Sequence, residues 1–247
     1  EGQQLPLHAS LPAVPGGTML SRAVAQLRSQ CRDWLLANPA DIVLVQGDTS
    51  TAYAGALAAR DCGINLAHLE AGLRTSTPLR PFPEEPFRRR ISLLARWHFA
   101  PTTAAASHLL EEGVDPKTVH VVGNSIVDEL RHSLAMESGD DIPWQHKGKR
   151  LLGMTMHRRE NYQQGLVNVC NTVLAILEQH PQLCVVSPVH PNPIVGTRIR
   201  RLLGNHPRIL LTEPLPYRPF IRLLKQADLV LTDSGGIQEE APYLGIR

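Results

Sequence analysis

The chain has 247 residues, of which 43% are hydrophobic and 19% charged, and its formal net charge is +2 at pH 7. These proportions are ordinary for a globular protein, and the small net charge predicts no attraction to nucleic acid or to a membrane surface. None of the four cysteines lies in a C-x-x-C pair, and no run approaches the length of a membrane span. The first residues also lack signal-peptide character, so we expect a cytoplasmic protein.

Short apolar runs alternate with amphipathic segments along the chain. An amphipathic segment at 19–36 precedes an apolar run at 42–45. Further runs lie at 119–122, 183–186, 209–211 and 229–231, and further amphipathic segments at 104–112, 166–179 and 199–203. Continuous apolar strands that alternate with helices are typical of parallel sheets covered on both faces. The pattern predicts an α/β protein with doubly wound, Rossmann-like sheets.

One segment, 137–149, interrupts this alternation. It is polar, contains glycine and proline, and precedes a predicted strand at 150–155. Such composition is typical of a link between domains. We therefore expect a first domain at 1–136, a linker at 137–149 and a second domain at 150–247.

Acidic residues follow the predicted strands of the first half. Asp48 follows the run at 42–46 and Glu70 follows the run at 64–69, where ligands bind in open α/β sheets. Glu84 comes next, in a proline-rich stretch that we interpret as a stiff loop. Carboxylates in such a set can remove one proton and deliver another. Asp48 equally suits the N-cap of a helix that begins near Thr51.

The second half places cationic and glycine-rich segments at the corresponding positions. His157, Arg158 and Arg159 follow the strand at 150–156, and Ser234-Gly235-Gly236 follows the run at 229–232. Arginine forks and a helix N-terminus with glycines both suit a diphosphate. A solvated loop and a plain strand-to-helix turn are the alternatives. The basic run 88–90 is interpreted as a solvated helix face.

Several familiar chemistries lack their motifs in this sequence. It contains no Walker A loop, G-x-G-x-x-G fingerprint, G-x-S-x-G elbow or H-E-x-x-H pair. This argues against an NTPase, a standard dehydrogenase and a serine hydrolase, and we expect neither a metal nor a cofactor. From the residues alone, we infer a nucleotide-diphosphate ligand and acid/base carboxylates.

Seven short motifs carry a more specific signal. They are Gly47-Asp48-Thr49, the segment 68–75 (HLEAGLRT), Pro83-Glu84-Glu85, the segment 122–125 (VGNS), the segment 157–161 (HRREN), the segment 188–193 (PVHPNP) and the segment 233–240 (DSGGIQEE). Together and in this order they resemble the non-hydrolysing UDP-N-acetylglucosamine 2-epimerases. The resemblance extends from about residue 20 to the end of the chain.

The resemblance implies a GT-B-like fold of two Rossmann-like domains with the substrate in an interdomain cleft. It implies reversible conversion of UDP-N-acetylglucosamine to UDP-N-acetylmannosamine, through UDP elimination and re-addition, for cell-surface polysaccharide precursors. The family members are commonly homodimers. By motif position, the catalytic residues would be Asp48, Glu70, Glu84 and His157, and the substrate-binding residues Arg74, Phe220 (uracil), Ser234, Gly235 and Gly236 (phosphates), and Glu240 (ribose).

The sequence departs from the family in three places. Phe87 stands where the family has Asn, and Pro86 where it has a small residue, so we expect a perturbed Glu84 loop. The family's first strand, with its Gly-Thr-Arg-Pro-Glu turn, and its final segment are expected beyond the two ends of this chain. An unpaired strand edge would follow, so we expect the chain alone to be unstable and inactive.

Three other functions remain open from the sequence. A hydrolysing 2-epimerase would release UDP and free N-acetylmannosamine. A GT-B glycosyltransferase would retain the proton at C2 of the sugar, and a non-catalytic binder would bind UDP without any isotope exchange. Each alternative therefore differs from the reversible epimerase in its products or in the fate of one proton.

Overall fold

The structure, a computed structural model, describes residues 9–136, 149–156 and 164–246. The chain forms two units, Glu1–Ser125 and Ile126–Arg247. None of the helices in this described part combines the length and the apolar character needed to cross a membrane. Most of the linker predicted at 137–149 lies outside the described residues, and so do His157, Arg158 and Arg159.

The first unit contains a parallel sheet of four strands in chain order. These strands are β1 (Ile42–Gln46), β2 (Asn65–Leu69), β3 (Trp97–Ala100) and β4 (Val119–Val121). The helices of this unit are α1 (Leu20–Ala37), which precedes β1, and α2 (Ser50–Asp61), α3 (Glu84–Leu94), α4 (Thr103–Glu111) and the 3-10 turn η1 (Pro116–Thr118), which lie between the strands. Because every pairing is parallel, all four strands present their carboxyl ends at one edge of the sheet.

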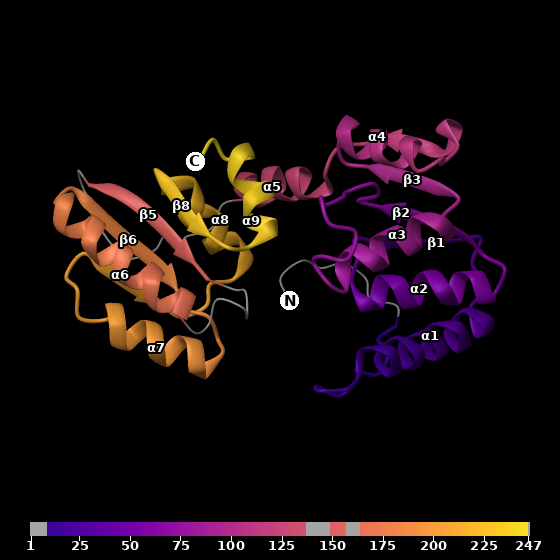
Figure 1. Cartoon of the computed structure of the whole chain (residues 1–247), viewed down its shortest axis with the longest axis horizontal. Helices are drawn as coiled ribbons and strands as arrows, with labels where there is room; N and C mark the ends of the chain where they lie inside the picture. The colour runs from indigo at the N-terminus through magenta and orange to yellow at the C-terminus, as the bar shows by residue number, and fades with distance from the viewer. Residues whose placement is uncertain (1–8, 137–148, 157–163, 247) are drawn as a thin grey trace. The chain divides into compact units, whose positions relative to one another are not determined.

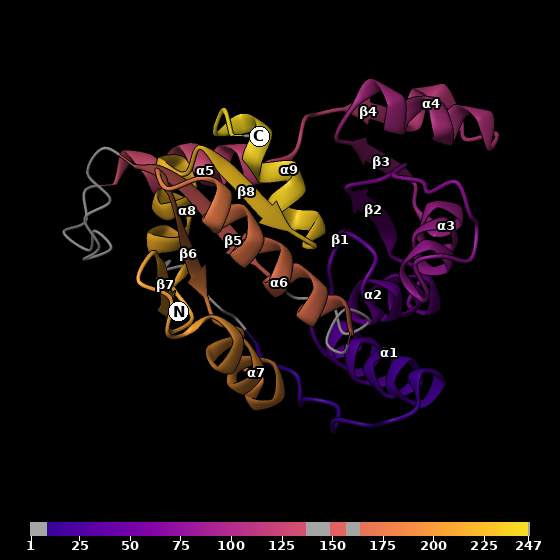
Figure 2. The same cartoon turned by 60° about the vertical axis from the view of Figure 1, so that its left-hand side comes forward.

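Small side chains let the helices of the first unit pack closely. Alanines of α2 and Ile91 of α3 cover Val45 and Leu66 of the sheet. On another side of α2 and α3, Phe87 packs with Val24 of α1 and other apolar residues. Helix α1 therefore lies against α2, as two views show (Figure 1, Figure 2).

The second unit contains a parallel sheet with the strand order β7-β6-β5-β8. Its strands are β5 (Arg150–Thr155), β6 (Leu183–Pro188), β7 (Ile209–Thr212) and β8 (Leu229–Thr232). Its helices are α5 (Ser125–Ala135), α6 (Gln164–Gln179), α7 (Pro193–Leu203), α8 (Tyr217–Gln226) and α9 (Gly235–Tyr243). Helix α5 packs with this unit, since Leu130 lies in one apolar cluster with residues of α8 and α9.

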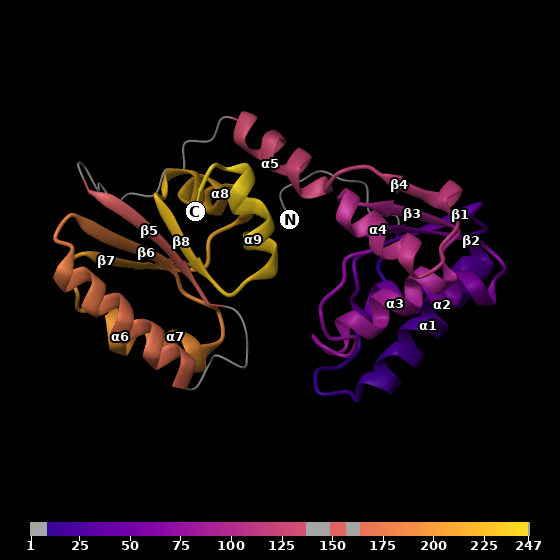
Figure 3. The same cartoon turned by 45° about the horizontal axis from the view of Figure 1, so that its top comes forward.

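Alternate residues of β5 point to opposite faces of the second sheet. Leu152 and Met154 pack with α6 and α7, whereas Leu151 packs with Leu223 and Ala227 on the side of α8. Figure 3 shows α6 and α7 along one face of this sheet and α8 along the other. The predicted α/β class with doubly wound parallel sheets is confirmed.

Candidate functional site

The backbone is left-handed directly after β1 and again directly after β2. Gly47 has φ +70° and Glu70 has φ +65°. A side chain at Gly47 would place its Cβ 3.2 Å from Glu70 Oε2, so glycine leaves room for this carboxylate. Gln46 Nε2 donates to Glu70 Oε1 at 3.0 Å. A left-handed backbone is energetically costly for residues other than glycine, and such residues cluster at functional sites. The backbone of Glu70 therefore supports Glu70 as a candidate site residue.

His68 of β2 supports the turn at Gly47 from inside the sheet. Its ring is fully buried, and Nε2 donates to the Gly47 carbonyl oxygen at 2.9 Å. Burial lowers the pKa of His68 to about 4, so the ring is neutral at pH 7. Its Nδ1 has no hydrogen-bond partner among the described residues. His68 therefore fixes the backbone next to Asp48 without adding a charge.

The structure corrects the simplest interpretation of Asp48. Helix α2 begins at Ser50, and its N-cap is Thr49, whose side chain accepts from Ala52 N at 3.2 Å. The Asp48 carboxylate instead pairs with Arg88 on α3. The alternative of Asp48 as an N-cap is therefore wrong, and the carboxylate lies beside a cation at the end of β1.

Glu84 lies on a helix rather than in the predicted loop. It is the first residue of α3, and Pro83 occupies the N-cap position. Acidic side chains are favoured in the first turn of a helix, which explains why α3 begins here. Glu84 Oε2 is buried without a hydrogen-bond partner among the described residues.

The basic run 88–90 is largely paired rather than solvated. Arg88 Nη1 donates to Glu85 Oε2 at 2.7 Å, and Arg89 Nε donates to Glu85 Oε1 at 2.9 Å. The Arg88 side chain is only 12% exposed and the Glu85 side chain 0%. The interpretation of a solvated helix face is therefore wrong for Arg88 and Arg89, whereas Arg90 is exposed.

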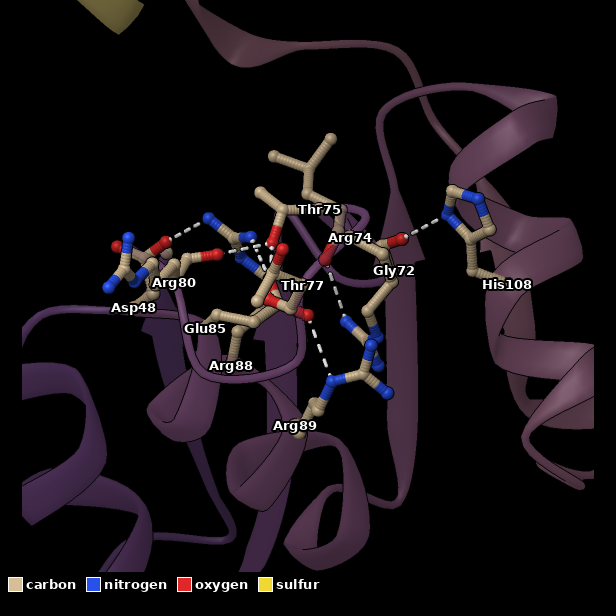
Figure 4. Close-up of polar contacts among 12 residues, drawn as sticks. Asp48, Gly72, Arg74, Thr75, Thr77, Arg80, Glu85, Arg88, Arg89 and His108 are labelled. Atoms are coloured by element: carbon tan, nitrogen blue, oxygen red, sulfur yellow. Dashed lines mark hydrogen bonds and ion pairs between the residues drawn. The ribbon is translucent and has the colours of Figure 1, made fainter. Parts of the chain in front are cut away.

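The same set of charges continues to the loop after β2. Arg89 Nη1 lies 2.5 Å from Glu112 Oε1, and Arg74 grips Glu112 through Nε at 2.8 Å and Nη2 at 2.6 Å. Hydrogen bonding to Arg74 lowers the pKa of Glu112. Arg74 also donates to the carbonyl oxygen of its neighbour Leu73 at 2.8 Å. Its two bonds to Glu112 tie the loop after β2 to the end of α4. Figure 4 shows Arg74 and Arg89 near each other, and Arg88 between Glu85 and Asp48.

Phe87 does not enter this polar side of α3. It is 5% exposed, and its ring stacks on Tyr53 of α2 with the centroids 4.7 Å apart. Because the next residue on the helix is Arg88, α3 places the aromatic ring in the core and the guanidinium beside Asp48. Phe87 therefore contributes to the packing of α1, α2 and α3.

In the second unit, the end of β8 leads directly into α9. Ser234 is the N-cap, and its backbone N–H donates to Thr232 Oγ1 at 3.0 Å. Gly235 and Gly236 follow and are exposed, and a Cβ at Gly236 would meet nothing closer than Ser234 Oγ at 3.9 Å. An open, glycine-lined helix N-terminus suits an anion, because N–H groups and the helix dipole both favour negative charge.

Glu240, six residues after the N-cap Ser234 of α9, is buried beside Tyr217. It is 6% exposed, and the Tyr217 hydroxyl donates to Glu240 Oε1 at 3.2 Å. Burial raises the pKa of the Glu240 carboxyl and, together with this neighbour, raises the pKa of Tyr217. Phe220 is partly buried in the apolar cluster that contains Ile237 of α9.

The structure thus groups the expected residues in two sets. Asp48, Glu70, Glu84 and Arg74 lie on neighbouring segments of the first unit. Phe220, Ser234, Gly235, Gly236 and Glu240 lie on α8 and α9 of the second unit, and His157 lies outside the described residues. Their roles in catalysis and binding stay predictions.

Sequence reasoning missed several partners of these residues. They are Gln46, Glu85, Arg88, Arg89, Glu112 and Tyr217. One signal was available, because Glu85 precedes the two arginines by three and four positions, the spacing at which helical side chains meet. No spacing in the sequence connects Arg88 with Asp48, which is 40 residues away.

The two parallel sheets, with their polar strand ends, define an α/β protein of the GT-B-like class. The family model described as UDP-N-acetylglucosamine 2-epimerase matches residues 6–247. The chain belongs to the UDP-N-acetylglucosamine 2-epimerase family.

Individual relatives give the extent of the similarity. The UDP-N-acetylglucosamine 2-epimerase of Salmonella typhimurium is 40% identical over 214 residues, which cover 83% of this chain and 57% of that protein. A crystal structure of UDP-GlcNAc 2-epimerase from Neisseria meningitidis bound to UDP-GlcNAc has a TM-score of 0.86 and 37% identity, and covers 94% of this chain and 65% of that one. The S. aureus MnaA–UDP co-structure has a TM-score of 0.87 and 38% identity, with 94% and 62% covered. The chain thus spans little more than half the length of the curated relative.

Proposed function

We propose that the protein carrying this chain converts UDP-N-acetylglucosamine reversibly to UDP-N-acetylmannosamine. A base removes the proton at C2 while the bond from C1 to the UDP oxygen breaks, and its electron pair leaves with UDP. The C1–C2 double bond remains in a 2-acetamidoglucal. A proton is then delivered to C2 on the opposite face, and the UDP oxygen adds back to C1. No net oxidation occurs.

The observation that carries this proposal is the meeting of Asp48, Glu70 and the start of α3 in one unit. Asp48 follows β1 and Glu70 follows β2, and these two strands are neighbours in the sheet. Arg88 of α3 pairs with Asp48. Inversion at carbon needs one group to take a proton and another to give one. We assign this work to Asp48, Glu70 and Glu84, while Arg74 orders the loop between them.

The second unit would hold the nucleotide. The exposed N-terminus of α9, at Ser234, Gly235 and Gly236, suits the diphosphate, which gains charge as UDP departs. Glu240 would contact the ribose and the region of Phe220 the uracil. His157 would assist at the diphosphate. The Neisseria structure bound to UDP-GlcNAc and the S. aureus co-structure with UDP support a UDP-sugar as the ligand.

We also propose a cytoplasmic homodimer that supplies cell-surface polysaccharide precursors. The four cysteines, all described, are free thiols, as is usual in a reducing compartment. Size-exclusion chromatography with light scattering tests the dimer, and a single-subunit mass would contradict it.

Product analysis tests the reaction. The protein that carries this chain is incubated with UDP-N-acetylglucosamine, and the products are separated by anion exchange and identified by proton and phosphorus NMR. We expect UDP-N-acetylmannosamine in equilibrium with substrate, and the same mixture when the reaction starts from UDP-N-acetylmannosamine. Accumulation of UDP with free N-acetylmannosamine would instead identify a hydrolysing enzyme.

A further inference from the structure

Glu85 is an acidic residue of the first unit for which the proposed reaction has no use. Its side chain is 0% exposed, and both carboxylate oxygens are occupied by arginines of the same helix. A buried carboxylate is costly unless it is paired and hydrogen-bonded, so the two guanidinium groups explain how it can be buried. Because both oxygens are already bound, Glu85 is poorly placed to exchange protons with a substrate.

Arg88 connects Glu85 to the proposed site. Its Nη1 donates to Glu85 Oε2 at 2.7 Å, while its Nη2 pairs with Asp48 Oδ2. A guanidinium group is planar and rigid, so a partner that fixes one nitrogen also sets the direction of the other. The position of Glu85 on α3 therefore decides how the Arg88 fork meets Asp48 at the end of β1.

Glu85 is itself held from the opposite side. Arg89 Nε donates to Glu85 Oε1 at 2.9 Å, and Arg89 Nη1 lies 2.5 Å from Glu112 Oε1. Glu112 also accepts two bonds from Arg74 in the loop after β2. Charges of alternating sign thus run from Arg74 through Glu112, Arg89, Glu85 and Arg88 to Asp48, and Figure 4 shows the part around α3.

We propose that Glu85 is a positioning residue that holds Arg88 against the Asp48 carboxylate. The proposal rests on the proposed function, in which Asp48 transfers a proton at C2. Glu85 touches neither substrate nor reacting atoms in this account. It acts by fixing the contact between Arg88 and the Asp48 carboxylate, which transfers the proton. Small displacements of a reacting group are known to slow reactions strongly.

The test compares Glu85→Gln, Glu85→Asp and wild type in the protein that carries this chain. Glu85→Gln keeps the shape and removes the charge. We expect kcat for epimerisation to fall about tenfold to a hundredfold, with KM and the Kd for UDP within about twofold of wild type. Glu85→Asp keeps the charge and should recover part of kcat. The matched control, Asp61→Asn, removes the acid of the separate Arg28–Asp61 ion pair and should leave kcat unchanged.

Crystal structures of wild type and Glu85→Gln separate this inference from the proposed function. We expect the contact between Arg88 and Asp48 in wild type and its loss in the variant. A retained contact, or a kcat equal to that of wild type, would overturn the positioning role. A wild-type protein without epimerase activity would overturn the proposed function, and the two crystal structures would still decide whether Glu85 places Arg88.

If Glu85→Gln does not fold, Arg88→Lys provides the second route. A lysine keeps the positive charge but is a single point of charge that cannot bridge two carboxylates as a fork does. We expect the same loss of kcat with unchanged KM. Wild-type kcat in this variant would overturn the proposal.

Discussion

The two units present different chemical groups at the ends of their strands. In the first unit, Asp48 and its neighbours are ionisable side chains that pair with one another across β1, α3 and α4. In the second, exposed glycines open the N-terminus of α9, and Glu240 accepts a hydrogen bond from a tyrosine hydroxyl.

This difference indicates that the two units have different functions. Side-chain charges that are fixed by their partners suit proton transfer, because the transferring group must be held in place while its protonation changes. Backbone N–H groups and a helix dipole suit a ligand that brings its own negative charge. The contrast explains why we assign the sugar chemistry to the first unit and the nucleotide to the second.

The largest expected effect comes from Asp48→Asn, which keeps the size of the side chain and removes its basicity. Deuterium incorporation at C2 of the sugar in heavy water should slow by roughly 10²- to 10⁴-fold, the usual worth of a general acid or base. The Kd for UDP, measured by calorimetry, should stay within about twofold. A parallel loss of UDP affinity would contradict the assignment of the sugar chemistry to the first unit and of nucleotide binding to the second. The control is Asp61→Asn, the same type of substitution in the separate Arg28–Asp61 ion pair, and it should leave the exchange rate unchanged.

A second substitution tests the backbone frame of the first unit. Gly72 has φ +84°, and a Cβ there would lie 2.1 Å from the Ala105 carbonyl oxygen of α4. Gly72→Ala should therefore lower the free energy of unfolding by about 3–5 kcal/mol, in the range of severe single substitutions. The matched control is Gly113→Ala, at φ +85° with nothing within 4 Å, which should cost about 1–2 kcal/mol. Equal losses in urea unfolding would contradict the close approach to α4.

The third prediction concerns pH and His68. The folded pKa of His68 is about 4 and the ordinary value 6.5, so the unfolded chain binds more protons between these limits. The free energy of unfolding should therefore decrease as the pH falls from 6.5 to 4, by at most about 3 kcal/mol from this group. Urea unfolding at several pH values measures it.

The variant His68→Gln should show a weaker dependence on pH than wild type, whatever its stability at pH 7. His132→Gln, at an exposed position of α5, is the control and should keep the wild-type slope. An unchanged slope in His68→Gln would mean that the histidine is not buried in its neutral form.

The smallest expected effect lies in the second unit. Tyr217→Phe removes the hydroxyl that donates to Glu240, which leaves a buried carboxyl oxygen without this partner. We expect UDP to bind about five- to tenfold more weakly, corresponding to about 1 kcal/mol for one hydrogen bond. The rate of C2 exchange at saturating substrate should not change. Tyr243→Phe, at a 59% exposed position of α9, is the control.

Periodicity predicted the sheets well because their strands are short, continuous and apolar. It gave no clear sign of β3, where the polar ring of His98 is buried and Nε2 donates to the Ser92 carbonyl oxygen at 2.9 Å. It also placed Glu84 in a loop, since the prolines before it mask the start of α3. Local pattern therefore predicts the class of fold better than the limits of single elements.

The candidate site was predictable in its acids and not in its cations. Asp48 and Glu70 follow apolar runs, which is visible in the sequence. The pairing of Arg88 with Asp48 depends on how α3 packs against the sheet, and an arginine run has the same appearance whether it is buried or exposed. The left-handed backbone of Glu70 is equally invisible, because glutamate has no preference for that conformation.

The fate of one hydrogen atom tests the central claim most directly. Wild-type protein is incubated with UDP-N-acetylglucosamine in heavy water, and C2 of both nucleotide sugars is followed by proton NMR. If the carboxylates of the first unit transfer a proton there, deuterium accumulates at C2 of product and of recovered substrate. Epimer that forms while the original hydrogen stays at C2 would contradict the account.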